Sequence, residues 1–299
     1  MRPPPHFMPA LITPFDDDGN IMVSAHLHNL HLQTSRGVGG FVLGGSTGEG
    51  PYLEPRERAL LVQQARSELG EQPFLVCGVA GQSVRQAVGQ VEEAATGGAD
   101  AALVMTPTGL ARGNHDAVVR FFEAVAEAAT IPLFLYSVPA VTGYELPIDC
   151  AATLSQHPNV IAMKDSGGRP VHIKELVQST QDDFMVYAGS SSTLAQAMAA
   201  GATGAITASG NYLPELVSSL VLTSRSSVSG ADPMQMQLAD ATRVVETFGV
   251  TGSKTAAAAA GLLAGLPRQP LQPLQRTDQA RIAQVVAAAR ALSKELVTS

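Results

Sequence analysis

One lysine in this chain stands where it could act as a nucleophile. Lys164 is one of four lysines beside fifteen arginines, and it follows the apolar run of residues 160–163. Such a run is typical of a buried strand. Burial disfavours the charged form of an amine, and a neutral lysine amine forms Schiff bases with carbonyl substrates. The alternative is structural: an amine that reaches the rim of the protein and pairs with Asp165.

A Schiff base needs a proton carrier nearby, and Tyr136 is the candidate. The protonated imine is an electron sink, from which carbon–carbon cleavage, condensation or elimination of a β-hydroxyl can follow. Tyr136 ends the apolar run of residues 132–136, and a positioned phenol can carry protons. We expect Thr47 to hydrogen-bond the phenol and pass the proton on. The alternative for Tyr136 is a rim tyrosine whose hydroxyl binds the backbone.

Residues 44–49, Gly-Gly-Ser-Thr-Gly-Glu, form a turn that could bind the carboxylate of a 2-oxo acid. Successive backbone N–H groups in such a turn bind anions, and Ser46 and Thr47 add two hydroxyls. A phosphate cradle is disfavoured because the Walker pattern ends in Gly-Lys-Ser/Thr, whereas Glu49 follows Gly48 here. A plain connecting turn is the alternative.

The elements that carry these residues alternate regularly between short apolar runs and amphipathic segments. Eight alternations favour an α/β fold, a (β/α)8 TIM barrel, over an open doubly wound sheet, and we predict a catalytic domain over residues 1–225. The predicted strands are residues 7–13, 40–43, 73–79, 101–105, 132–136, 160–164, 184–188 and 204–207. The predicted helices are residues 24–36, 54–69, 83–97, 114–129, 147–156, 171–180 and 192–200, with an eighth from about residue 213.

This topology brings the chemical residues together. In such barrels the active site lies at the carboxyl ends of the strands. Tyr136 and Lys164 end two strands, and the turns at residues 44–49 and 189–191 follow two others. We therefore expect an amine, a phenol and hydroxyl-rich turns to converge on one mouth, which favours the Schiff-base role of Lys164.

Residues 226–299 are predicted to form a C-terminal helical extension. Its helices are expected at residues 233–248, 253–264 and 277–296, with prolines between the second and the third. We expect the extension to serve subunit contacts or to form a lid rather than to take part in the chemistry.

Composition argues against several classes of protein. The net charge of −7, without a basic cluster, disfavours nucleic acid and anionic membrane as partners. The apolar stretches are too short to span a bilayer, and the N-terminus lacks a signal-peptide core.

Cys77 and Cys150 are expected to be buried free thiols in a cytoplasmic protein. His26, His28 and His31 have metal-like spacing, but on a helix the first two point to different faces, so we expect no metal there.

Three blocks of sequence resemble the dihydrodipicolinate synthase / N-acetylneuraminate lyase superfamily. They are residues 45–49 (GSTGE), residues 135–143 (LYSVP followed by TG) and residues 163–168 (MKDSGG), in the order and spacing of that superfamily. The resemblance covers roughly residues 7–265. It implies a homo-oligomer, dimer or tetramer, of (β/α)8 barrels that needs no cofactor or metal, with Lys164 as the Schiff-base residue and Tyr136 as the proton carrier.

The resemblance also implies which residues bind the oxo acid. Ser46 and Thr47 match the residues that bind the pyruvate carboxylate, while Gly189 and Ile206 match positions of backbone contact. The predicted substrate-binding residues are Ser46, Thr47, Gly48, Ser166, Gly189 and Ile206.

Departures from the superfamily pattern narrow the choice of branch within the superfamily. Dihydrodipicolinate synthases usually carry an arginine two residues before Gly143, where this chain has Val141, so that activity is disfavoured. Sialic acid lyases have an acidic pair where residues 191–192 are serines. Many members have a tyrosine in the place of residues 108–110, Thr-Gly-Leu. The sequence around residues 135–168 most resembles 4-hydroxy-2-oxoglutarate aldolases.

The leading hypothesis is a metal-independent class I aldolase. It would cleave a 4-hydroxy-2-oxo acid such as 4-hydroxy-2-oxoglutarate into pyruvate or glyoxylate and a small aldehyde or oxo acid. A dihydrodipicolinate synthase and a 2-keto-3-deoxy sugar acid aldolase or dehydratase are alternatives that share the imine. A non-catalytic barrel that binds an oxo acid is an alternative of another class, which the missing strand-4 tyrosine keeps open.

Overall fold

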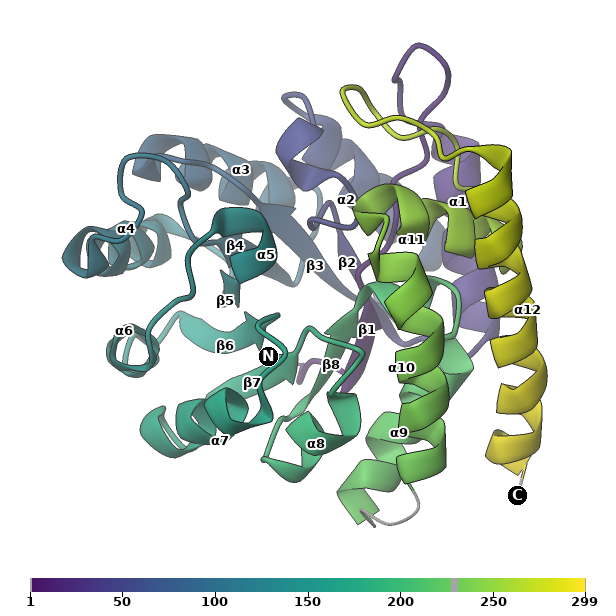
Figure 1. The fold of residues 1–299 in the computed structure, drawn as a ribbon. Helices are drawn as coiled ribbons and strands as arrows, with labels where there is room; N and C mark the ends of the chain where they lie inside the picture. Colours follow the sequence, from purple (N-terminus) through teal and green to yellow (C-terminus); the bar gives the residue numbers. More distant parts are fainter. Residues whose placement is uncertain (1, 227–230, 299) are drawn as a thin grey trace.

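Eight parallel strands form one sheet that closes into a barrel (Figure 1). The computed structural model describes residues 2–226 and 231–298. The order of the strands around the sheet is β1-β8-β7-β6-β5-β4-β3-β2. The strands are β1 (Phe7–Pro9), β2 (Gly40–Leu43), β3 (Phe74–Val79), β4 (Ala101–Met105), β5 (Leu133–Ser137), β6 (Val160–Asp165), β7 (Met185–Ala188) and β8 (Gly204–Thr207).

β1 and β2 meet at the seam that closes the barrel. Ala10 and Val42 form one parallel bridge, and the N–H of Leu11 donates to Val42 O at 2.9 Å. The (β/α)8 barrel predicted from the sequence is thereby confirmed.

Helices follow the strands and cover the outside of the barrel. They are α1 (Val23–Ser35), α2 (Glu57–Leu69), α3 (Val84–Thr96), α4 (His115–Ala128), α6 (Ile148–Leu154), α7 (Pro170–Ser179), α8 (Leu194–Ala199) and α9 (Pro214–Ser226). Two of them begin at clear N-caps: the Ser83 side chain accepts the N–H of Gln86 at 3.3 Å, and the Asn114 side chain accepts the N–H of Ala117 at 3.0 Å. Such caps satisfy N–H groups that have no partner within the helix.

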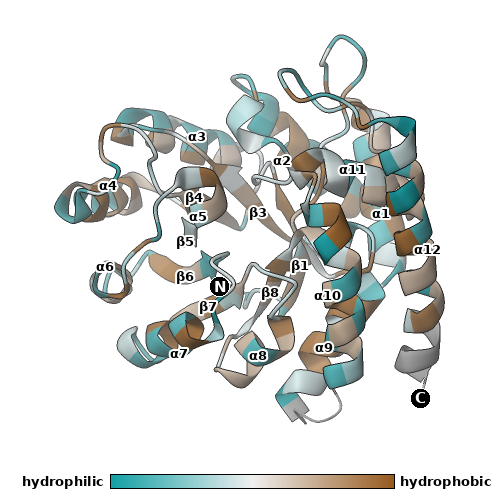
Figure 2. Cartoon of the chain, viewed as in Figure 1, coloured by the Kyte–Doolittle hydropathy of each residue, from teal (hydrophilic) through white to brown (hydrophobic). Residues whose placement is uncertain are grey.

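The strands are buried on both faces. Inside the barrel, Phe134 and Tyr187 stack with ring centroids 5.9 Å apart. On the outside, strand side chains pack against apolar helix faces, such as Val118, Phe122 and Val125 of α4. Figure 2 shows apolar residues concentrated in the strands and polar residues on the outer parts of the surrounding helices. Two buried faces explain why the strands appear in the sequence as unbroken apolar runs.

The structure differs from the sequence prediction in short elements. One-turn helices α5 (Pro139–Thr142), η1 (Gly50–Tyr52) and η2 (Ala208–Asn211) were not predicted. β1 ends at Pro9 rather than at residue 13, since the N–H of Ile12 donates to the side chain of Asn211 at 3.0 Å instead of to a strand.

Three further helices lie together on one side of the barrel, beside α9 (Figure 1). They are α10 (Asp232–Glu246), α11 (Gly249–Ala259) and α12 (Arg276–Thr298), each within a few residues of a predicted helix start. The predicted domain boundary after residue 225 adjoins residues 227–230, which are outside the described part of the chain, and the division into two domains stays a prediction. Cys77 and Cys150 are buried and free, as predicted. Across the described residues, no helix combines the length and the apolar character that a membrane span requires.

Candidate active site

Lys164 and Tyr136 lie side by side at the carboxyl ends of β6 and β5. They are register partners in this parallel pair, and each is 4% exposed. Lys164 Nζ donates a hydrogen bond to the Tyr136 hydroxyl at 3.3 Å and lies 4.3 Å from the centre of its ring. The two strands therefore bring the predicted amine and the predicted phenol into direct contact.

The neighbours of Tyr136 make its phenol more acidic. Burial alone would raise the pKa of Tyr136, but the charge of Lys164, the hydrogen bond from its amine and the nearby hydroxyls of Ser46 and Ser166 lower it below its usual value. Proton transfer is most efficient when the pKa of the carrier approaches the working pH. The site thus favours a phenol that exchanges protons with a bound substrate.

The amine of Lys164 does not pair with Asp165 in the structure. Successive side chains of a strand point to opposite faces, so the Asp165 side chain lies outside the barrel. Its Oδ1 accepts the N–H of Gly167 at 3.0 Å, and its Oδ2 lies 3.6 Å from His172 Nε2. The structural alternative for Lys164, a rim ion pair with Asp165, is therefore not what the structure contains.

Asp165 and His172 belong to a buried network that we did not predict from the sequence. Burial raises the pKa of Asp165, against the lowering effects of a backbone hydrogen bond and of His172. Close by, Arg169 forms an ion pair with Glu145. These contacts join the loop after β6 to the loop before α6. The only sequence signal was a histidine on the buried face of a helix.

The turn at residues 44–49 is pressed against the neighbouring strands. A Cβ at Gly48 would lie 2.7 Å from Leu11 O, and a Cβ at Gly78 in β3 would lie 2.2 Å from the carbonyl oxygen of Gly44. Only glycine fits at such distances from backbone atoms. Gly78 was missed in the sequence, where its signal is a glycine inside an apolar run.

Ser46, rather than Thr47, is the hydroxyl of this turn that lies next to the phenol. Ser46 Oγ is buried and makes no well-formed hydrogen bond within the described residues, although it is near enough to Tyr136 to lower the pKa of the phenol. Buried polar atoms normally have partners, so this hydroxyl is ready to receive a ligand oxygen. In the described structure Thr47 makes no hydrogen bond to Tyr136, so its relay function stays a prediction.

Ser166 and Gly189 flank the lysine. A Cβ at Gly189, directly after β7, would lie 2.0 Å from Ser166 Oγ and 3.0 Å from Lys164 Cε. Ile206 of β8 packs inside the barrel in the same apolar cluster as Tyr136. The structure thus brings Ser166 and Gly189 to Lys164, and the contacts predicted between an oxo acid and Gly48, Gly189 or Ile206 stay predictions.

The loop between β4 and α4 carries the sequence that replaces the tyrosine of the superfamily pattern. The Thr108 hydroxyl donates to Gln82 Oε1 at 2.9 Å, and Leu110 is fully exposed. Further along this loop, Arg112 Nη1 lies 3.2 Å from the place that a Cβ at Gly143 would take. Among the described residues Arg112 makes no ion pair, so its charge is free to meet an anion.

The three histidines with metal-like spacing do not come together. His26 is buried and its Nε2 donates to Leu61 O at 3.1 Å, whereas His28 is exposed. His31 pairs with Glu68 at 2.7 Å. The rings therefore have separate surroundings, as their positions on the helix predicted.

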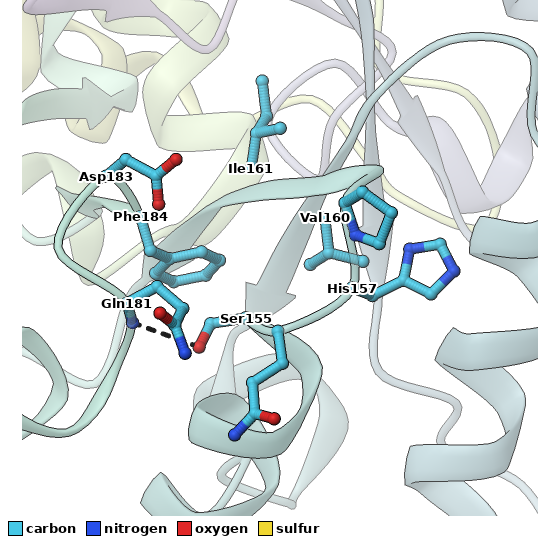
Figure 3. Close-up of a pocket in the computed structure, with 9 residues that line it drawn as sticks. Ser155, His157, Val160, Ile161, Gln181, Asp183 and Phe184 are labelled. Carbon is cyan, nitrogen blue, oxygen red and sulfur yellow. Dashed lines mark hydrogen bonds between the residues drawn. The ribbon is translucent and has the colours of Figure 1, made fainter.

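A pocket of about 350 Å³ lies at the opposite end of the barrel, by the amino ends of β6 and β7 (Figure 3). Its lining includes Ser155, His157 and Phe184, and Ser155 Oγ accepts the N–H of Gln181 at 3.3 Å. Since Lys164 stands near the carboxyl end of β6, this pocket is separate from the candidate active site.

Comparison with known proteins places this geometry in a family. The model of the dihydrodipicolinate synthetase family matches residues 4–289. The chain is 32% identical over 285 residues to the 4-hydroxy-tetrahydrodipicolinate synthase of Methanothrix thermoacetophila, covering 93% of this chain and 94% of that one. It is 31% identical over 281 residues to 4-hydroxy-tetrahydrodipicolinate synthase 1 of Streptomyces coelicolor, covering 93% and 91%.

Solved structures agree with the sequence comparison. The chloride-inhibited dihydrodipicolinate synthase of Acinetobacter baumannii, complexed with pyruvate, has a TM-score of 0.89 and 26% identity, covering 95% of this chain and 98% of that one. YagE of E. coli K12, also complexed with pyruvate, has a TM-score of 0.88 and 25% identity, covering 95% and 97%. The predicted closeness to 4-hydroxy-2-oxoglutarate aldolases is not confirmed by these relatives. The chain belongs to the dihydrodipicolinate synthetase family, a family of aldolase-type carbon–carbon lyases.

Proposed function

We propose that Lys164 forms a Schiff base with pyruvate and that the protein uses the resulting enamine to make or break a carbon–carbon bond. The observation that carries this proposal is the buried contact between Lys164 Nζ and the Tyr136 hydroxyl, 3.3 Å long, at the carboxyl ends of two barrel strands. Two relatives of known structure are complexes with pyruvate, which supports this oxo acid as the first substrate.

The proposed reaction moves one proton at a time. The amine of Lys164 gives up a proton and adds to C2 of pyruvate, and the carbonyl oxygen takes protons by way of Tyr136 and leaves as water. Loss of a proton from C3 of the protonated imine gives the enamine. C3 then attacks an aldehyde carbon, whose oxygen takes a proton, and water releases the product from Lys164. Cleavage of a 4-hydroxy-2-oxo acid is the same sequence in reverse.

The turn at residues 44–49 is the proposed site for the pyruvate carboxylate. The hydroxyls of Ser46 and Thr47 and the N–H groups of the turn can donate to it, and Ser46 Oγ has no other well-formed hydrogen bond among the described residues. With the carboxylate held there, C2 is presented to Lys164 between Ser166 and Gly189. Positioning of this kind accounts for a large part of catalysis in two-substrate reactions.

Condensation with aspartate semialdehyde, the 4-hydroxy-tetrahydrodipicolinate synthase reaction, is the reaction that the relatives support best. The second candidate is cleavage of 4-hydroxy-2-oxoglutarate. It is favoured by one observation: Val141, 55% exposed on α5, stands where dihydrodipicolinate synthases usually have an arginine.

We further propose that the protein is a homo-oligomer, dimer or tetramer, with the fully exposed Leu110 side chain covered by another subunit. Light scattering tests the oligomeric state.

Reductive trapping tests the imine directly. Incubation with pyruvate and borohydride should add one reduced pyruvyl group per chain, which peptide mapping should locate on Lys164. A label on Lys174 or Lys254 instead, or no label, overturns the proposal. Rates of pyruvate condensation with aspartate semialdehyde and of pyruvate release from 4-hydroxy-2-oxoglutarate, measured side by side, decide between the two reactions.

A further inference from the structure

A buried ion pair joins the turn at residues 44–49, called the oxo-acid turn from here on, to the C-terminal helices. Lys254 Nζ of α11 lies 2.6 Å from Glu49 Oε1, and the two side chains are 3% and 0% exposed. Glu49 is the residue directly after Ser46-Thr47-Gly48, and it has a left-handed backbone with φ of 58°. Few residues other than glycine adopt that conformation, so the surroundings of Glu49 must hold it.

The surroundings of the pair come mostly from the C-terminal part of the chain. Glu49 Oε2 accepts the N–H of Arg268 at 2.7 Å, and Lys254 Nζ donates to Leu266 O at 2.5 Å. Lys254 Nζ also lies 4.6 Å from the ring centre of Phe15, which is fully buried. Glu49 Oε2 and Lys254 Nζ therefore each have a hydrogen-bond partner outside the pair, Glu49 Oε1 faces the charge of Lys254, and both side chains are shielded from water.

The position of this carboxylate has an electrostatic consequence. An unpaired negative charge that follows the turn would repel the carboxylate that the turn is proposed to bind, because the Glu49 side chain is fully buried and water screens a buried charge only weakly. Lys254 cancels that charge. Helix α11 would then contribute to the binding of the oxo acid although none of its residues needs to touch it.

We propose that Lys254 is a positioning residue for the oxo-acid site: by pairing with Glu49 it keeps the turn at residues 44–49 attractive to a carboxylate. The inference rests on the proposed function. It gives the C-terminal helices a role beyond the subunit contacts or lid expected from the sequence. It predicts an effect on oxo-acid binding rather than on the chemical step, since Lys164 and Tyr136 stand on other strands.

The test compares four variants by the pyruvate concentration that gives half-maximal borohydride trapping. Lys254→Met keeps the bulk of the side chain but leaves Glu49 unpaired, and it should raise this concentration at least about tenfold. Glu49→Gln should not raise it, because the charge that remains attracts a carboxylate. The double variant leaves no unpaired charge and should return to within about threefold of the wild type. Lys174→Met, at an exposed lysine on α7, is the matched control and should behave as the wild type.

Steady-state kinetics add a second measurement. In Lys254→Met, KM for pyruvate should rise together with the pyruvate concentration that gives half-maximal trapping. The value of kcat should stay within about twofold of the wild type. An unchanged half-saturation in Lys254→Met, or a tenfold rise in the double variant, overturns the proposal. If Lys254→Met does not fold, as judged by circular dichroism, the double variant decides alone: a tenfold rise in its half-saturation overturns the proposal. A wild-type protein that traps no pyruvate contradicts the proposed function instead.

Discussion

Tyr136 and Lys164 are register partners on adjacent parallel strands, and the phenol accepts its hydrogen bond from the amine. A one-residue slip of either strand would turn one of the two side chains out of the barrel. The inner core that fixes this register includes Phe134, two residues before Tyr136, and Ala162, two residues before Lys164. Packing below the site thus determines the geometry of the chemistry above it.

Removing the phenolic hydroxyl should separate folding from turnover. Tyr136→Phe keeps the packed ring, so circular dichroism and the unfolding midpoint should change little. Turnover should fall by about 10²-fold or more, the scale of general acid–base catalysis. Lys164→Ala should abolish both turnover and borohydride trapping. Near-native turnover in Tyr136→Phe would assign the proton transfer to another group, with Ser166, whose hydroxyl lies beside Lys164, as a candidate.

The two hydroxyls of the oxo-acid turn should differ in their effects. Ser46 lies against the phenol and Thr47 does not, so Ser46→Ala should lower kcat more than Thr47→Val does. Both variants should raise KM for pyruvate, because each removes a donor to its carboxylate. The comparison of kcat and KM for the two variants is the measurement. A larger kcat loss in Thr47→Val would restore the relay expected from the sequence.

Arg112 should be the residue that meets the carboxylate of a second substrate. Its charge has no ion-pair partner among the described residues, whereas Arg169 is already paired with Glu145. If aspartate semialdehyde is the substrate, Arg112→Met should raise the KM for this aldehyde at least about tenfold, because the loss of a hydrogen bond to a charged group weakens binding by that order. The KM for pyruvate should stay unchanged. Arg169→Met is the control, with a smaller effect expected. An unchanged KM for the aldehyde in Arg112→Met would contradict this assignment.

Activity should survive EDTA and dialysis. The protonated imine already supplies the electron sink for which other aldol enzymes use a metal ion as Lewis acid. Turnover measured before and after chelation is the test. Loss of activity with recovery on adding zinc would direct attention to Glu145, Asp165 and His172, whose donor atoms lie within 4.8 Å of one another.

His26 should make the protein less stable in acid. Its Nε2 donates to Leu61 O, while its buried Nδ1 has no partner among the residues that the structure describes. Burial, partly offset by that hydrogen bond, lowers its pKa from 6.5 to about 4. Between these values the unfolded chain binds the proton and the folded chain does not, so this contribution is present above pH 6.5 and is lost as the pH falls towards 4. It amounts to about 3 kcal/mol.

Urea unfolding at several pH values measures this contribution. The difference in unfolding free energy between the wild type and His26→Gln should shrink by about 3 kcal/mol from pH 7 to pH 4. His28→Gln, at an exposed position of the same helix, is the control variant. A difference that stays constant with pH would show that His26 does not carry the depressed pKa.

Much of the barrel follows from local sequence. Runs such as residues 101–105 and 204–207 are buried on both faces, and their strands have the predicted bounds. α5 was missed because a single turn that begins at Pro139 has too few residues to show a helical period. β1 was predicted too long because the residues after Pro9 are still apolar and buried. Ala10 and Leu11 still bond to neighbouring strands, but the N–H of Ile12 donates to the side chain of Asn211.

The positions of site residues could be predicted only where the topology of the barrel determines them. The strand ends place Lys164 and Tyr136 together, since parallel strands present their carboxyl ends at one mouth. The choice between Ser46 and Thr47 beside the phenol depends on the path of one turn, which no periodicity encodes. The pair of Glu49 and Lys254 joins distant parts of the chain and left no pattern in either.

Gly48 and Gly78 have a consequence for how this enzyme can diversify. Any side chain at either position would collide with backbone, so the turn that we propose to bind the oxo acid cannot accept substitutions there. Arg112, in the loop before α4, and Val141, on α5, have exposed side chains and no such restriction. If the turn binds the oxo acid as proposed, new substrate ranges can evolve by changes at Arg112 and Val141 while the turn stays the same.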